Sequence, residues 1–295
     1  MSIFCPLCGE KSQLSFQTSD VNRRCSEEVF SYYRCSACDL LFLTPIPADL
    51  TDYYPPSYHV IPKSLDALVV NSEPERYKID IILNFIKQGR LLEIGPASGG
   101  FSYLAKNAGF EVEAIEMDKK CCDFLNQVVG IRAINSHDES AALRKLAPVH
   151  VIALWHVIEH LPEPWIMLEE AAKKLLPGGI LVIAAPNPAA LQFKILGKYW
   201  THVDAPRHVS LIPLSTLTRK MKAYGMQAVL QTTRDAGSIG WNSFGWRESF
   251  ANFFVHPRAK RLARIIGTIL TKVLAPLESR EGRGSAYTVV FRQEK

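Results

Sequence analysis

One segment constrains the fold of this chain more than any other: an apolar run at 91–94 passes directly into a glycine-rich turn, Gly95-Pro96-Ala97-Ser98-Gly99. The next residues, 101–108, have helical spacing, and a second apolar run at 112–117 carries Glu116 near its end. Glycines let a backbone approach a ligand, and a carboxylate on the next strand can accept hydrogen bonds from both ribose hydroxyls. The pattern predicts a strand, turn, helix and strand unit that binds a nucleoside.

The same turn argues against two other nucleotide-binding loops. No Lys-Ser or Lys-Thr follows it, so it is not the P-loop that holds nucleotide phosphates. Ala97 stands where the dinucleotide fingerprint has its second glycine, which argues against a dinucleotide.

Two Cys-x-x-Cys pairs, Cys5/Cys8 and Cys35/Cys38, open the chain. Four thiolates make a closed tetrahedral zinc site, which is structural because it leaves no position for water. Gly9 and Asp39 follow the pairs where the turn needs a positive φ. We therefore predict a zinc ribbon over 1–45, with zinc supplying most of its folding energy, and a Tyr- and Pro-rich linker over 46–74. The linker is either a spacer or a cover of the ligand pocket.

Further motifs follow in the order expected of an open α/β sheet. A buried-strand candidate at 149–155 ends in Trp155 and leads into His156-Val157-Ile158-Glu159-His160. A helical segment then ends at Leu176-Pro177-Gly178-Gly179, a strand candidate at 180–185 ends in Pro186-Asn187, and a loop rich in His and Pro covers 197–213.

Together these motifs resemble class I S-adenosylmethionine-dependent methyltransferases, of the small-molecule subgroup catalogued as type 23, over roughly residues 75–292. The resemblance implies an α/β fold: a Rossmann-like seven-stranded sheet with an antiparallel final hairpin. The methyltransferase domain would cover 75–295, with a helical insertion at about 238–284.

The resemblance also implies a set of cofactor contacts. Gly95, Ala97 and Gly99 would face the methionine part of S-adenosylmethionine, and Glu93 would support the turn. Glu116 corresponds to the ribose-binding acid and Met117 to the residue beside adenine. Asp138 or His137 corresponds to the reader of the adenine amino group, and Trp155 is assigned to the same site.

Candidate catalytic residues lie after the fourth and fifth strands, at the sheet edge where ligands bind. Methyl transfer needs alignment, and a base if the acceptor is a hydroxyl. His208 is the first candidate base and His160 the second. His156 and Glu159 would join His160 in holding the loop or a divalent cation, in a motif similar to that of ubiquinone-pathway O-methyltransferases. A long-helix zinc-protease motif is excluded because Pro162 and Pro164 follow.

The distribution of charge and of apolar residues limits the classes of partner that this chain can bind. The net charge of +5 is concentrated within 247–283, which contains eight Lys or Arg and three Asp or Glu. Because the rest of the chain is neutral overall, no nucleic-acid-binding face is expected. That segment contains a basic amphipathic helix, 256–274, which is either a lid over the acceptor pocket or a peripheral membrane contact. No apolar run is long enough to span a membrane. Seven cysteines and the lack of a signal-peptide pattern at the start lead us to expect a cytoplasmic protein.

The sequence thus predicts an enzyme that methylates a small molecule. Oxygen is the first candidate for the methylated atom and carbon the second, and both a lipid-linked and a sugar-like acceptor agree with the sequence. Two alternatives remain: a zinc-ribbon RNA base methyltransferase, which the few basic residues of the ribbon disfavour, and a non-catalytic scaffold, which the intact turn and Glu116 disfavour.

Overall fold

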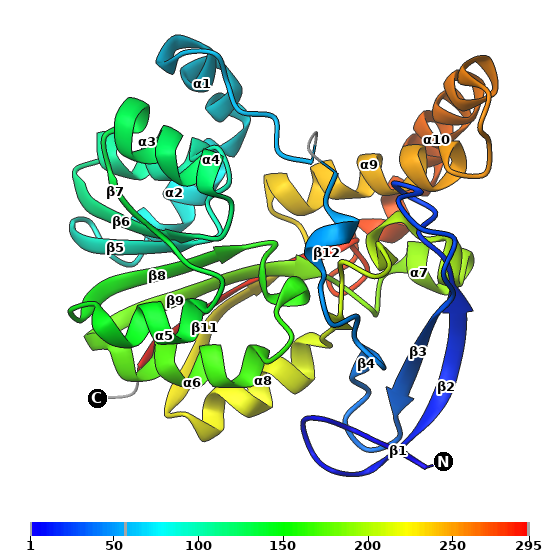
Figure 1. Cartoon of the computed structure of the whole chain (residues 1–295), viewed down its shortest axis with the longest axis horizontal. Helices are drawn as coiled ribbons and strands as arrows, with labels where there is room; N and C mark the ends of the chain where they lie inside the picture. The colour runs from blue at the N-terminus through cyan, green and yellow to red at the C-terminus, as the bar shows by residue number, and fades with distance from the viewer. Residues whose placement is uncertain (1, 56–57, 294–295) are drawn as a thin grey trace.

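A seven-stranded mixed sheet forms the centre of the chain (Figure 1); the computed structural model describes residues 2–55 and 58–293. In sheet order its strands are β11 (Met226–Thr232), β12 (Ala286–Gln293), β9 (Leu175–Pro186), β8 (Val149–Trp155), β5 (Gly89–Ile94), β6 (Phe110–Glu116) and β7 (Arg132–Asn135). β12 is antiparallel to both its neighbours, and the other pairs are parallel. The predicted Rossmann-like sheet with an antiparallel final hairpin is confirmed.

Helices cover both faces of this sheet (Figure 1). The α-helices of the described residues are α1 (Leu65–Ser72), α2 (Arg76–Leu83), α3 (Gly100–Asn107), α4 (Lys119–Phe124), α5 (Glu139–Lys145), α6 (Pro164–Lys174), α7 (Leu191–Leu196), α8 (Leu214–Ala223), α9 (Ala236–Ala251) and α10 (Pro257–Glu278). β8 and β9 are apolar on both faces, as expected of strands buried between two helical layers.

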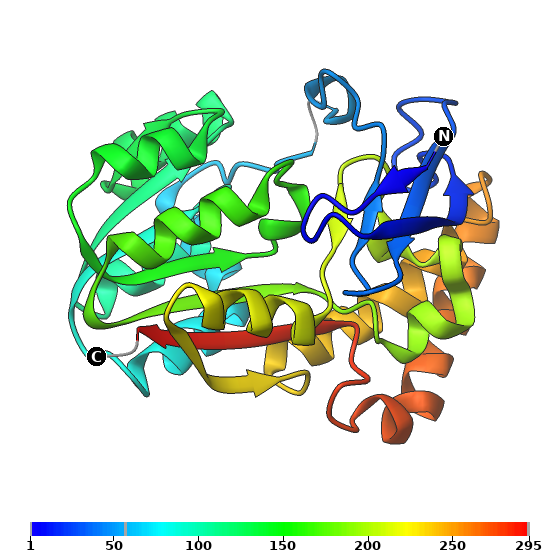
Figure 2. The ribbon, with the colours of Figure 1, turned by 90° about the horizontal axis from the view of Figure 1, so that it is seen from below.

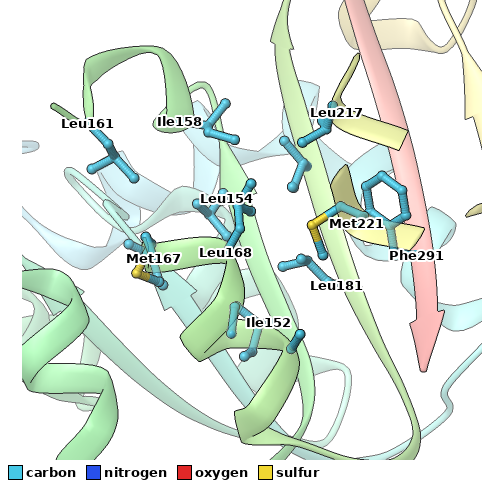
Figure 3. Close-up of a cluster of buried hydrophobic side chains, with 14 of the residues drawn as sticks. Ile152, Leu154, Ile158, Leu161, Met167, Leu168, Leu181, Leu217, Met221 and Phe291 are labelled. Atoms are coloured by element: carbon cyan, nitrogen blue, oxygen red, sulfur yellow. The ribbon is translucent and has the colours of Figure 1, made fainter. Parts of the chain in front are cut away.

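One apolar core contains side chains of the central sheet and of the helices that cover one of its faces (Figure 3). Ile152 and Leu154 of β8 belong to the same cluster as Leu168 of α6 and Met221 of α8, and all four are almost completely buried. This packing fixes the carboxyl ends of β5 and β8, where the order of the strands reverses and ligands bind in such sheets.

A second sheet contains the N-terminal ribbon (Figure 2). Its strands, in sheet order, are β1 (Ile3–Phe4), β2 (Lys11–Thr18), β3 (Phe30–Cys35), β4 (Leu41–Leu43) and β10 (Ser210–Leu211). Four of them come from the first 43 residues, whereas β10 follows the fifth parallel strand of the central sheet. The ribbon is therefore joined to the central domain by strand pairing, Ser210 to Phe42 and Leu211 to Leu41.

α9 and α10 form a helical hairpin at the same end of the molecule as the ribbon (Figures 1 and 2). They occupy the segment where the sequence predicts a helical insertion. No helix among the described residues is long and apolar enough to cross a membrane.

Candidate active site

The turn after β5 approaches its neighbours closely. Gly95 has φ +67°, and a Cβ there would lie 2.7 Å from a methyl carbon of Val157, so no other residue fits without a shift. Ala97 also has a positive φ, +49°, and its backbone N–H donates to Glu116 Oε2 at 2.8 Å. The N–H of Asp118 donates to the other oxygen of Glu116 at 2.8 Å. The acid at the end of β6 is thus fixed against the turn at the end of β5.

These residues line a cavity of about 600 Å³, within the usual size range of small-molecule sites. Its wall combines the turn, the ends of β6 and β8 and the linker; the lining includes Tyr54, Tyr58, His59, Gly95, Ala97, Glu116, Met117, His137, Glu139, Trp155, His156 and His160. Burial raises the pKa of Glu116 to about 7. Of the two alternatives for the linker, a cover of the ligand pocket agrees with this lining.

Three residues assigned to the cofactor lie behind the cavity wall. Gly99 has φ +83° at the N-terminus of α3, and the Glu93 carboxylate accepts a 2.5 Å hydrogen bond from Ser102 Oγ inside the core. Asp138 accepts a hydrogen bond from the N–H of Ala141 and caps α5. One oxygen of this carboxylate is thus engaged in capping, while its neighbours His137 and Glu139 line the cavity.

A second cavity, of about 390 Å³, adjoins the first. Three parts of the chain build it: the ribbon supplies Asn22 and Arg23, the loops after β8 and β9 supply the histidines, and α9 and α10 supply Trp241, Phe244, Glu248, Lys260 and Arg264. Tyr58, His156 and His160 line both cavities. A ligand in each would therefore meet at these three side chains.

His208, His160 and Glu159 converge in the second cavity. One nitrogen of each ring and one carboxylate oxygen all lie within 4.8 Å of one another. His208 Nδ1 lies 2.7 Å from the carbonyl oxygen of His202. Since a carbonyl only accepts, Nδ1 carries a hydrogen, so Nε2 is the ring nitrogen that can accept a proton.

Glu159 is buried, and among the described residues neither of its carboxylate oxygens has a hydrogen-bond partner. Burial raises its pKa to about 7. His160 is anchored through Nδ1, which lies 3.0 Å from the Tyr54 hydroxyl and 3.1 Å from the carbonyl oxygen of Arg207. Burial lowers the pKa of His160 to about 3, so its ring is neutral near pH 7.

His156 lies outside this convergence. It has φ +59°, its ring packs against Trp241 with 4.6 Å between centroids, and its Nδ1 lies 3.5 Å from Glu159 Oε1. Its pKa is lowered to about 3 by burial, and so is that of His202. The group of possible cation ligands, Glu159 with His160 and His208, therefore includes His208 in place of the His156 expected from sequence.

Sequence reasoning missed the ribbon's share of this site. Asn22 Nδ2 donates to the carbonyl oxygen of Thr201 at 2.6 Å and to Asp204 Oδ1 at 2.5 Å. Asp20 pairs with the fully buried Arg207, which also binds Asp204. These partners are about 180 residues apart in the sequence. The only local signal is a composition typical of a polar loop, Ser-Asp-Val-Asn-Arg-Arg.

The four ribbon cysteines form one cluster. Their sulfurs lie 3.5 Å (Cys8 to Cys35), 3.6 Å (Cys5 to Cys38) and 3.8 Å (Cys8 to Cys38) apart. A tetrahedral zinc with bonds of about 2.3 Å separates its sulfurs by about 3.8 Å, so the spacing fits the ion. Backbone N–H groups of Leu7 and Ala37 point at Cys5 and Cys35, and Gly9 and Asp39 have the predicted positive φ.

The sheet order, the glycine turn and the acid at the end of β6 define a class I methyltransferase fold. A family profile described as a methyltransferase domain, type 23, matches residues 71–231. The chain belongs to this family and is an S-adenosylmethionine-dependent methyltransferase.

Solved structures share the fold at low sequence identity. A SAM-dependent methyltransferase from Archaeoglobus fulgidus is 18% identical, with TM-score 0.52, over 75% of this chain and 94% of that chain. A protein assigned as a sarcosine dimethylglycine methyltransferase from Galdieria sulphuraria is 12% identical, with TM-score 0.52, over 81% and 95%. A protein assigned as a methyltransferase from Bacillus halodurans is 12% identical, with TM-score 0.50, over 75% and 99%. No protein of curated function matches the sequence.

Proposed function

We propose that this methyltransferase binds S-adenosylmethionine in the cavity at Gly95 and Glu116 and methylates an oxygen of a small-molecule acceptor held in the adjoining cavity. The observation that carries the proposal is that Tyr58, His156 and His160 line both cavities. Donor and acceptor would meet at this junction, which is what in-line transfer requires.

The cofactor supplies a methyl group on a sulfonium sulfur. Glu116 would accept hydrogen bonds from the ribose hydroxyls, while Met117, Trp155 and the neighbours of Asp138 enclose the nucleoside. Trp155 lines this cavity, and its buried Nε1 has no hydrogen-bond partner among the described residues.

His208 is the base in this proposal, with Nε2 as the acceptor of the proton. As the new oxygen–carbon bond forms, the carbon–sulfur bond breaks with its electron pair left on sulfur, and the acceptor's hydroxyl proton passes to Nε2 of His208. Glu159, buried without a hydrogen-bond partner among the described residues, would then stabilise the imidazolium. Such base catalysis contributes typically 10²–10⁴-fold.

A divalent cation held by Glu159, His160 and His208 is a second candidate, supported by the close approach of their ligand atoms. Carboxylate and imidazole suit zinc or another first-row cation. It would bind an ionised acceptor oxygen and remove the need for a base.

The ribbon is proposed to hold one structural zinc through Cys5, Cys8, Cys35 and Cys38. Reduced thiolates support the cytoplasm as its compartment. Asn22 and Arg23 in the wall of the second cavity support a role for the ribbon in shaping the acceptor site rather than in presenting RNA. The polar wall with Trp241 and Phe244 suits a hydroxylated, sugar-like acceptor.

The test is transfer of a labelled methyl group from S-adenosylmethionine to a library of hydroxylated metabolites, with and without a chelator. Wild type should label an acceptor that His208→Ala labels far more slowly, whereas the exposed control His256→Ala keeps full activity. Label on carbon or nitrogen would refute oxygen as the acceptor atom, and activity lost to a chelator and restored by a divalent cation would favour the second candidate.

A further inference from the structure

The helix α10 has two faces of opposite character. Ala263 and Gly267 are buried on the inner face, where a Cβ on Gly267 would lie 2.6 Å from the Cα of Arg247 of α9. The outer face carries Leu262, Ile265, Ile266, Ile269 and Val273, which share one side of the helix and are 43% to 65% exposed. An apolar face of five large side chains is therefore left open to solvent.

Basic side chains border this apolar face. Arg258, Arg261 and Lys272 are exposed and lie along one edge of it at helical spacing. The one acidic residue of α10, Glu278, is buried and bonded to Gln192 and Trp246. The exposed part of the helix thus carries positive charge and no negative charge.

The turn before α10 is also apolar and exposed. Phe253, Phe254 and Val255 are 50%, 44% and 74% exposed. Arg24 of the ribbon donates to the carbonyl oxygens of Asn252 and Phe254, at 3.0 and 3.4 Å, and so holds the turn in place. The apolar surface is accordingly presented by an anchored element rather than by a free loop.

We infer that α10 and the turn at 253–255 dock the protein on the surface of an anionic phospholipid bilayer. An amphipathic helix with a basic border lies in the headgroup region, its apolar side chains reaching the acyl boundary. Since no described helix can span a membrane, the contact is peripheral. This inference goes beyond the proposed reaction and does not depend on its acceptor.

Charge decides between a bilayer and a second copy of the chain. A symmetric dimer through this face would bring the positive borders of both copies together without an exposed acid in α10 to balance them. An anionic lipid surface instead attracts each basic residue. The bilayer is therefore the occupant that the surface fits.

Flotation of the full chain with vesicles tests the inference. We expect binding to vesicles of phosphatidylcholine with phosphatidylglycerol, and much weaker binding to phosphatidylcholine alone. Replacing Arg258, Arg261 and Lys272 with Gln should weaken partitioning roughly 100-fold, because each basic residue near such a surface contributes about fivefold. The double variant I265D/I269D should abolish it.

Two control variants match these changes elsewhere on the surface. Val70→Asp alters an exposed apolar residue of α1, and Lys222→Gln removes an exposed charge from α8; both should float like wild type. S-adenosylmethionine binding should be unchanged in all variants, which shows that they fold. Wild type that stays unbound to anionic vesicles, or variants that bind like wild type, would overturn the inference. So would a wild-type dimer that I265D/I269D converts to a monomer without any vesicle binding.

Discussion

The carboxylate of Asp20 bonds both terminal nitrogens of Arg207, at 2.6 and 3.1 Å, although the two residues are 187 positions apart. Arg207 is fully buried and also binds Asp204, which accepts a hydrogen bond from Asn22. Hydrogen bonds and charge from Arg207 hold the pKa of Asp20 below its usual value in spite of burial. This pair ties the ribbon to the loop that carries His208.

We expect Asp20→Ala to lower the free energy of unfolding by about 3–5 kcal/mol, because it removes one partner of a buried charge. Denaturant titration measures the change. Asp123→Ala is the matched control, since its pair with Lys119 lies on the surface, where such pairs contribute about 0–1 kcal/mol. Equal losses in both variants would mean that the Asp20 pair contributes nothing beyond a surface bridge.

Glu116→Ala should weaken S-adenosylmethionine binding by about 1–3 kcal/mol, because the ribose hydroxyls lose a charged acceptor. The pKa of Glu116, raised to about 7 by burial, gives the binding a pH dependence. Affinity should rise by up to about tenfold as pH rises through 7 and the carboxylate ionises. Calorimetry of wild type and Glu116→Gln checks both points; the Gln variant should bind weakly without this dependence.

His208→Ala should lower turnover by about 10²–10⁴-fold while leaving cofactor affinity nearly intact. His160→Ala should have a smaller effect on turnover, since His160 is held by Tyr54 and the Arg207 carbonyl. Single-turnover kinetics separate the two. Full activity in both variants would indicate an acceptor that needs no base, such as a carbon nucleophile or an already ionised group.

Metal analysis should find one tightly held zinc per chain, and Cys5→Ser or Cys38→Ser should lose it. The cofactor cavity takes no residue from the ribbon before Ile46, whereas the acceptor cavity includes Asn22 and Arg23. We therefore expect these variants to bind S-adenosylmethionine but not to turn over. A native protein without metal would refute the zinc site.

Glu93→Gln should stabilise the protein at alkaline pH. Burial raises the pKa of Glu93 to about 8, so the folded state holds its proton more tightly than the unfolded state. Stability from this group is present at low pH and is lost as pH rises from about 4.5 through 8, by roughly 3–5 kcal/mol in all. Thermal unfolding near pH 5 should show little difference between wild type and variant, whereas above pH 8 the variant should melt higher.

The sequence predicted the central sheet well, because its signals are local. Its central strands are short apolar runs, and the turn at Gly95 and the acid at Glu116 lie within one strand, turn, helix and strand unit. The second cavity could not be predicted in the same way. Asn22 and Trp241 reach it from segments that show no pairing signal with the loops after β8 and β9, so only tertiary packing brings them together.

Asp138 illustrates a further limit. A shift of one position along the chain changes whether a side chain caps a helix or faces a ligand, and a polar residue suits both positions. The sequence points to the segment, and the hydrogen bond from Ala141 shows that Asp138 also caps α5.

The pairing of β4 with β10 has a consequence for the order in which the chain is made. β4 ends at Leu43, but its partner begins at Ser210, so a ribosome must add more than half of the chain before the ribbon's sheet can be closed. Domains usually fold from the N-terminus during synthesis. Until β10 is made, Leu41 and Phe42 therefore lie at an open edge of the ribbon, which is exposed to pairing with the wrong strand.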